Sequence, residues 1–191
     1  MGKMKYLNLV MKLFEKSHIV DFASIKKIVK NDAYAKLLIH NLVANGRVYK
    51  LTKGIYTKHS NSELAVFAFK PAYFGLHDAL SFHNIWEQET IPVIVTSRLV
   101  RTGLRSILGS NVLIRHINQR LFFGYEYIAR GDIAYPYSDI EKTLIDLVFF
   151  KETIDSNVLK KLRASINRDK LSKYLKRCDK KTREKVIGIV K

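Results

Sequence analysis

The sequence predicts an α+β protein of two domains, one over residues 1–60 and a larger one over residues 61–191. Apolar residues recur at the 3.6-residue spacing of amphipathic helices through the first 44 residues. Residues 92–137 change to short runs rich in β-branched and aromatic side chains, which indicate a small, mostly antiparallel sheet. The last forty residues return to helical spacing. With 191 residues, of which 47% are hydrophobic, the chain can bury a core in each domain.

The first domain is predicted to contain three short helices and a β-hairpin. The first helix carries an apolar stripe of Leu7, Val10, Met11 and Phe14. Asp21 and Asn31 are suited to cap the second and third helices, and Gly46 is suited to end the third. The β-like runs 47–50 and 55–57 flank a turn. Three helices followed by a hairpin form the outline of a winged helix-turn-helix domain.

In a winged helix-turn-helix the third helix enters the major groove of DNA, and its outer face reads bases. That face here carries hydrogen-bonding and aromatic side chains: Tyr34, Lys36, Leu37, His40 and Asn41. We expect base contacts from Asn31, Tyr34, Lys36 and His40. Phosphate or minor-groove contacts are expected from Arg47, Lys50 and Lys53 of the hairpin, and backbone contacts from Lys26, Lys27 and Lys30 of the second helix. The alternative is a trihelical domain that only contacts proteins, with these lysines merely solvated.

The second domain is predicted to follow a linker that closes in a capping box of Ser60 and Glu63. Two helices come next, over residues 64–69 and 77–84. The strands are expected in four runs: 93–95, 111–117, 121–127 and 133–135.

A second capping box, Ser138 with Glu141, predicts the start of a helix that is central to the second core. Its apolar face consists of Ile140, Thr143, Leu144, Leu147 and Val148. Three more amphipathic helices are predicted within residues 151–191, the last two of them capped by Asp169 and Asp179. The outer faces of these three helices are almost entirely lysine and arginine.

The charge distribution points to a polyanionic partner. The formal net charge is +17, with +9 in residues 1–60, −1 in residues 61–150 and +9 in residues 151–191. Double-stranded DNA would relieve the repulsion among these charges through phosphate neutralisation. We therefore predict a second, sequence-blind phosphate surface made of Lys160, Lys161, Arg163, Lys173, Lys176 and Arg177. A solvated basic surface is the alternative, and an anionic membrane surface is a weaker one.

No pattern in the sequence predicts a catalytic, cofactor or metal site. The six histidines lack metal-ligand spacing, and the glycines form neither a Walker A loop nor a dinucleotide fingerprint. The lone cysteine, Cys178, falls on an apolar stripe and is expected to be a buried small residue, although neighbouring cations could lower its pKa. The N-terminus lacks the features of a signal peptide and no segment approaches eighteen apolar residues, so a cytoplasmic protein is expected.

Three segments carry a common pattern: Gly46 to Tyr56 (GRVYKLTKGIY), the region from Tyr73 to Pro92, and Ile140 to Leu147 (IEKTLIDL). Together they resemble the AbiEi antitoxin family, the transcriptional regulators of abortive-infection toxin–antitoxin systems. The resemblance covers about residues 5–150. Departures from the family's pattern are Lys50 and Lys53 in place of arginine, together with Gly75, Asn84 and Ile140. The resemblance implies a winged helix that binds inverted repeats in its own promoter, and a larger domain that neutralises a nucleotidyltransferase-like toxin without a stable complex.

The sequence thus predicts a non-enzymatic, sequence-specific DNA-binding repressor that autoregulates its operon as the antitoxin of a type IV pair. One alternative is a stand-alone regulator without antitoxin activity. Another is a binding module for protein or RNA that uses the trihelical domain as a scaffold. A third is a nucleic-acid enzyme with an unrecognised site in the middle of the chain, against which the lack of clustered acids argues.

Overall fold

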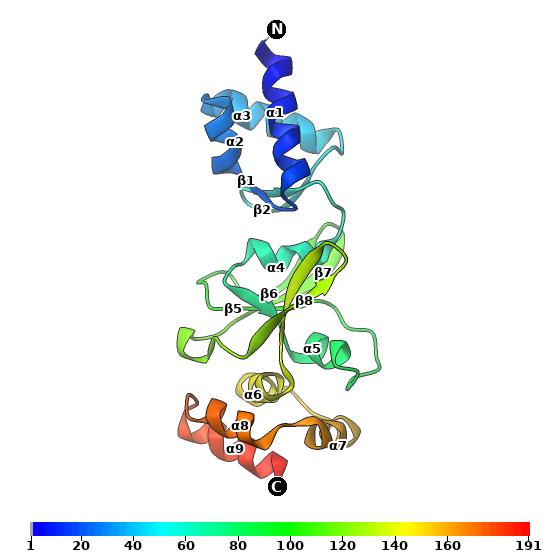
Figure 1. Cartoon of the computed structure of the whole chain (residues 1–191), viewed down its shortest axis with the longest axis vertical. Coiled ribbons are helices and arrows are strands. Elements are labelled where there is room, and N and C mark those ends of the chain that lie inside the picture. The colour runs from blue at the N-terminus through cyan, green and yellow to red at the C-terminus, as the bar shows by residue number, and fades with distance from the viewer. Residues whose placement is uncertain (1) are drawn as a thin grey trace. The chain divides into compact units, whose positions relative to one another are not determined.

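The computed structural model describes residues 2–191 and has a mixed α+β architecture, with nine α-helices and two β-sheets in that range (Figure 1). The chain divides into two compact units. Unit 1 comprises residues 1–68 and 106–110, and unit 2 comprises residues 69–105 and 111–191. Among the described residues, no helix combines the length and the hydropathy that a membrane crossing requires.

Unit 1 contains a three-helix core with a small antiparallel sheet. Its elements are α1 (Gly2–Lys16), β1 (Val20–Asp21), α2 (Phe22–Val29), α3 (Asp32–Ala44), β2 (Tyr49–Thr52), β3 (Ile55–Thr57), the 3₁₀ helix η1 (Ser62–Leu64) and α4 (Ala65–Ala68). The strand order is β1-β3-β2. Val10 and Phe14 of the predicted first stripe are buried, where they pack with Ile25, Leu38 and Leu42 from the other two helices.

The predicted N-caps of α2 and α3 are confirmed. The Asp21 carboxylate accepts a hydrogen bond from the backbone N–H of Ser24 at 2.7 Å, and the Asn31 side chain accepts one from the N–H of Tyr34 at 2.9 Å. Two details of the predicted hairpin were wrong. The first strand covers 49–52 instead of 47–50, so that only two residues form the turn, and β1 adds a third strand through the pairing of Val20 with Tyr56.

Unit 2 contains most of one six-stranded sheet, of which residues 106, 107 and 110 belong to unit 1. The sequence analysis predicted this sheet as small and mostly antiparallel. Its strands are β4 (Ala72–Phe74), β5 (Val93–Thr96), β6 (Gly103–Ile107), β7 (Ser110–His116), β8 (Tyr125–Arg130) and β9 (Ile133–Ser138). The order is β6-β7-β5-β4-β9-β8, and the pairs β5–β7 and β4–β9 are parallel. The sheet is therefore mixed, because the chain crosses over between β5 and β7 and between β4 and β9.

The predicted strand over 121–127 was also wrong. A 3₁₀ helix, η2 (Gln119–Leu121), occupies its beginning, and β8 starts only at Tyr125. Gly124 separates the two with a φ of +67°, in the left-handed region that breaks an extended strand. The strands β4 and β6 were not predicted. β4 has three residues and is buried on both faces, so it shows no alternation.

The helices of unit 2 are α5 (Leu76–Phe82), α6 (Ile140–Phe150), α7 (Ser156–Ser165), α8 (Arg168–Leu175) and α9 (Lys180–Val190). α6 lies between the sheet and the layer formed by α7, α8 and α9 (Figure 1). Its residues Leu144, Ile145 and Leu147 are fully buried in the main core cluster. The prediction of a central helix at this position is confirmed.

Three predicted caps were assigned to the wrong residue, while Asp179 caps α9 as predicted. Asn61 instead of Ser60 caps η1, Asp139 instead of Ser138 caps α6, and Asn167 instead of Asp169 caps α8. Ser138 is unavailable because it ends β9, where its hydroxyl shares a 2.7 Å hydrogen bond with the Thr143 hydroxyl.

Charged side chains of α6 are buried inside unit 2, which the sequence analysis did not predict. The side chains of Lys142 and Asp146 are both 0% exposed and form an ion pair. The Tyr73 hydroxyl donates a 2.7 Å hydrogen bond to the other oxygen of Asp146. The Lys142 ammonium also lies over the rings of Tyr73 and Phe123, at 5.6 and 5.0 Å from their centroids. Burial raises the pKa of Asp146, although the neighbouring Lys142 opposes this shift.

Candidate nucleic-acid interface

A groove of about 430 Å³ in unit 1 separates α3 from the β2–β3 hairpin. Its floor is apolar and its walls are basic. The lining residues are Phe22, Lys36, Ile39, His40, Val43, Lys50, Lys53, Gly54 and Tyr56. Four residues predicted to bind DNA, two from α3 and two from the hairpin, are thereby brought to one concave surface.

Local backbone geometry fixes the hairpin wall of this groove. The two-residue turn of Lys53 and Gly54 places Gly54 at a φ of +76°, which a residue without a Cβ adopts at least cost. The Gly54 carbonyl accepts a 2.8 Å hydrogen bond from the N–H of Phe22, so the turn is tied to the start of α2. On β2, Leu51 is buried and Lys50 is exposed, because successive strand residues point to opposite faces.

The α3 wall follows from helical spacing. Lys36 and His40 are four residues apart and therefore lie one above the other on the same face. Leu37 lies beside them and is 53% exposed. A thymine methyl group is a base feature that such a side chain can contact.

Asp32 engages two of the predicted cations. Its carboxylate lies 2.7 Å from the Lys36 ammonium and 3.1 Å from the Lys26 ammonium. Hydrogen bonds from Lys36 and then Lys26 lower the pKa of Asp32. Both pairs are exposed, so they are weak and exchange readily with a phosphate. The other basic positions, Lys27, Lys30, Arg47, Lys50 and Lys53, are exposed and form no ion pair within residues 2–191.

Asn31 and Tyr34 have structural roles as well as their predicted contacts with bases. The Asn31 carbonyl oxygen is used in capping α3, which leaves its amide group as the donor that can reach outward. The Tyr34 ring is half-buried and packs edge-on against Tyr6, with centroids 6.1 Å apart. Asn31, Lys36 and His40 are exposed, and Tyr34 is therefore the least accessible member of the predicted base-contacting set.

The predicted second phosphate surface is divided between two regions of unit 2. All six of its residues are exposed, with Lys160, Lys161 and Arg163 on α7, Lys173 on α8, and Lys176 and Arg177 just after α8. Several have partners: Lys161 is paired with Glu87, Arg163 Nε donates to the Ile189 carbonyl at 2.6 Å, and Arg177 lies 4.3 Å above the Phe123 ring.

Lys160 and Lys161 also line a pocket of about 710 Å³ that includes Glu87 and Asp155. The α7 cations thus face acidic groups, whereas Lys173 and Lys176 form no ion pair among the described side chains. The second region is therefore the more strongly cationic of the two.

Two observations concern residues that could have formed a metal site or a reactive thiol. Across the residues that it describes, no three His, Cys, Asp or Glu side chains are arranged to hold a metal ion. Cys178 is buried, as predicted, and burial raises the pKa of its thiol by more than the nearby cations of Lys142 and Arg183 lower it.

No protein-family model matches the sequence, and no curated protein is similar to it. Among solved structures, the Rv2827c protein from Mycobacterium tuberculosis has a similar fold. The TM-score is 0.62 at 13% sequence identity, over 95% of this chain and 74% of that one. At this identity the likeness concerns the fold alone.

Proposed function

We propose that this protein is a sequence-specific DNA-binding transcriptional repressor, and that unit 1 is a winged helix-turn-helix domain. The observation that carries the proposal is the groove between α3 and the hairpin, with Lys36 and His40 on one wall and Lys50 and Lys53 on the other. Basic side chains on both sides of a concave surface can neutralise phosphates of one strand while the exposed helix face reaches base edges.

The dimensions and connectivity of unit 1 support this role. α3 has 13 residues and is therefore roughly 20 Å long, which suits insertion into a major groove roughly 12 Å wide. The sheet order β1-β3-β2, with three helices before the hairpin, is the connectivity of winged helices. In the bound state Lys36, Leu37 and His40 face the bases, and the Lys53 turn contacts the flanking backbone.

The resemblance to AbiEi antitoxins extends the proposal. The protein represses its own operon through inverted repeats, acts in the cytoplasm and counteracts a nucleotidyltransferase-like toxin without forming a stable complex with it. A toxin reading frame beside this one in the genome would support the antitoxin role, and its absence would favour a stand-alone regulator.

An electrophoretic mobility shift with the protein's own upstream DNA and a scrambled duplex of equal length tests DNA binding. We expect the upstream duplex to bind more tightly. If about six phosphates are neutralised, affinity falls roughly a thousandfold between 50 and 200 mM salt. Equal affinity for the two duplexes and a flat salt series would both contradict the proposal.

Substitutions in the groove locate the binding surface. Lys36→Ala combined with His40→Ala is expected to abolish the preference for the upstream duplex, whereas Lys185→Ala, an exposed lysine on α9, leaves it intact. Circular dichroism checks that each variant is folded. Unchanged preference in the double variant would favour a protein- or RNA-binding role for unit 1.

A further inference from the structure

A stretch in the middle of the chain has an unusual set of charged residues. Residues 90–125 contain five arginines but no lysine, aspartate or glutamate. The rest of the chain has 23 lysines and only six arginines. The arginines of this stretch are Arg98, Arg101, Arg105, Arg115 and Arg120. Arginine differs from lysine in offering a planar fork of donors that matches two oxygens of a phosphate at once.

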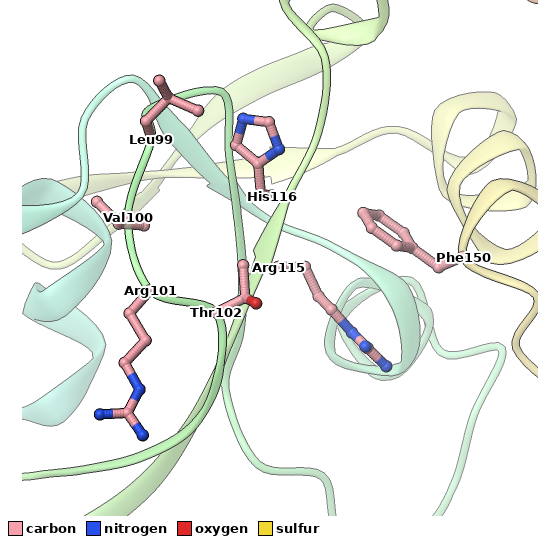
Figure 2. Close-up of a pocket in the computed structure, with 7 residues that line it drawn as sticks. All are labelled: Leu99, Val100, Arg101, Thr102, Arg115, His116 and Phe150. Carbon is pink, nitrogen blue, oxygen red and sulfur yellow. The ribbon is translucent and has the colours of Figure 1, made fainter.

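Two of these arginines line one open pocket of about 660 Å³ in unit 2 (Figure 2). The pocket is formed by the loop after β5, the end of β7 and the end of α6, and its lining residues are Leu99, Val100, Arg101, Thr102, Arg115, His116 and Phe150. β5 and β7 are parallel, with Thr96 opposite His116. The segments that leave both strands therefore start at the same edge of the sheet, the edge where open sheets commonly bind ligands.

The lining of the pocket is cationic, and no acidic residue belongs to it. Arg101 is exposed and forms no ion pair within the described chain. Arg115 is held in place: one terminal nitrogen is 2.6 Å from Glu152, and its guanidinium lies 5.7 Å from the centroid of the Phe150 ring. Figure 2 shows the Arg101 and Arg115 side chains on either side of Thr102, with the ring of His116 above them.

We propose that this pocket binds a phosphate group of a nucleotide. Arg101 supplies the uncompensated charge, Arg115 a positioned guanidinium, and Thr102 and His116 further hydrogen-bonding groups. Leu99, Val100 and Phe150 give the apolar surface that covers a sugar or base. The volume is in the range of small-ligand sites. The phosphate can belong to a free nucleoside phosphate or to the backbone of bound DNA, and the latter case rests on the proposed function.

The test uses the full-length chain with ATP and with its upstream DNA duplex as separate probes, by calorimetry and fluorescence anisotropy. The informative variant is Arg101→Gln, and Arg168→Gln is a matched control, since Arg168 is exposed, lies on α8 and is outside the pocket. Thermal melts check that both variants are folded, which we expect because both positions are exposed.

Weakening of ATP binding by about tenfold or more in Arg101→Gln, but not in Arg168→Gln, would identify a free nucleotide as the ligand. If the wild-type chain does not bind ATP, and Arg101→Gln but not Arg168→Gln weakens binding of the DNA duplex, the ligand is the nucleic-acid backbone. If neither probe distinguishes the two variants, the pocket is not a phosphate site and the inference is overturned. A wild-type chain that binds ATP through Arg101 but binds no DNA would refute the proposed function alone.

Discussion

The substitution Lys142→Met tests how much the core depends on the buried ion pair between Lys142 and Asp146. It removes the cation that compensates Asp146, whose side chain is 0% exposed. After substitution the carboxylate keeps only the 2.7 Å hydrogen bond from the Tyr73 hydroxyl. Breaking a buried pair from one side commonly costs about 3–5 kcal/mol, because an uncompensated charge stays in a low-dielectric interior. We expect a loss of that size in the free energy of unfolding of unit 2 at pH 7.

A matched control is present in the same unit. Lys180 and Glu184 form an ion pair with the same spacing on α9, but the Lys180 side chain is 88% exposed. Lys180→Met is therefore expected to cost less than about 0.5 kcal/mol. Urea denaturation followed by the fluorescence of Trp86, the single tryptophan of the chain, reports on unit 2 in both variants.

The pH dependence separates lost charge compensation from lost packing. Without Lys142, the pKa of buried Asp146 rises further, so the folded variant holds a proton that the unfolded chain releases near pH 4. A group whose pKa is raised by folding contributes stability that is lost as pH rises through the folded-state pKa. The penalty of Lys142→Met should therefore shrink as pH falls from neutral towards 5, by at most about 1.4 kcal/mol per pH unit.

The double variant Lys142→Met, Asp146→Asn completes a double-mutant cycle for this ion pair. It removes both charges and should recover much of the loss at pH 7. If Lys142→Met lowers the free energy of unfolding by less than about 1 kcal/mol, or by an amount that does not change with pH, the two buried charges do not compensate each other as argued.

Three further predictions concern backbone strain, alkaline titration and thiol access. Gly124→Ala should destabilise unit 2 by about 1–3 kcal/mol more than Gly131→Ala in the same urea assay, because both have positive φ but only at Gly124 would a Cβ meet other atoms, the nearest in Tyr174 at 2.8 Å. Burial, followed by hydrogen bonding to Asp139, raises the pKa of Tyr174 to about 12. Stability from this tyrosine is therefore present below pH 10 and lost as pH rises towards 12, and ultraviolet titration of Tyr174→Phe should lack this late-ionising phenol. Cys178 should react with a thiol reagent only upon unfolding, because it is 1% exposed and burial raises its pKa; rapid labelling of the native chain would contradict this.

Sequence reasoning succeeded where the determining interactions are local. The helices of unit 1 follow from apolar spacing and from caps such as Asp21 and Asn31, whose hydrogen bonds reach only three residues along the chain. It did not supply the strand order or the parallel pairs of the large sheet, because pairing such as Phe74 with Tyr137 joins segments far apart in sequence. No periodicity within either segment specifies that partner.

Burial of the Lys142–Asp146 pair on α6 was also missed, although the apolar composition of the helix could have indicated it. Lys142 and Asp146 are spaced as a surface ion pair would be, and this spacing by itself suggests an exposed face. The helix over 140–150, however, is apolar on nearly all sides, and a helix of that kind is buried throughout. Charged residues within it must therefore find partners inside the core.

The sequence predicted which residues belong to the candidate interface, but not that they surround one groove. Exposure of Lys36, His40, Lys50 and Lys53 follows from helix and strand periodicity. Their placement around one groove involves tertiary contacts such as the hydrogen bond from Phe22 to Gly54, which ties the hairpin turn to the start of α2. That contact is tertiary and left no trace in the sequence pattern.

Burial also changes the balance of charges that are exposed on the protein surface. The middle segment, residues 61–150, carries a formal net charge of −1, from eight cations and nine acids. Three of those acids, Asp139, Glu141 and Asp146, are buried, whereas Lys142 is the one buried cation of the segment. The side chains that remain outside the core therefore carry a small net positive charge, and most of the cations among them are arginines. A segment that is close to neutral in the sequence thus has a slightly positive exposed surface, because folding withdraws more acids than bases from solvent.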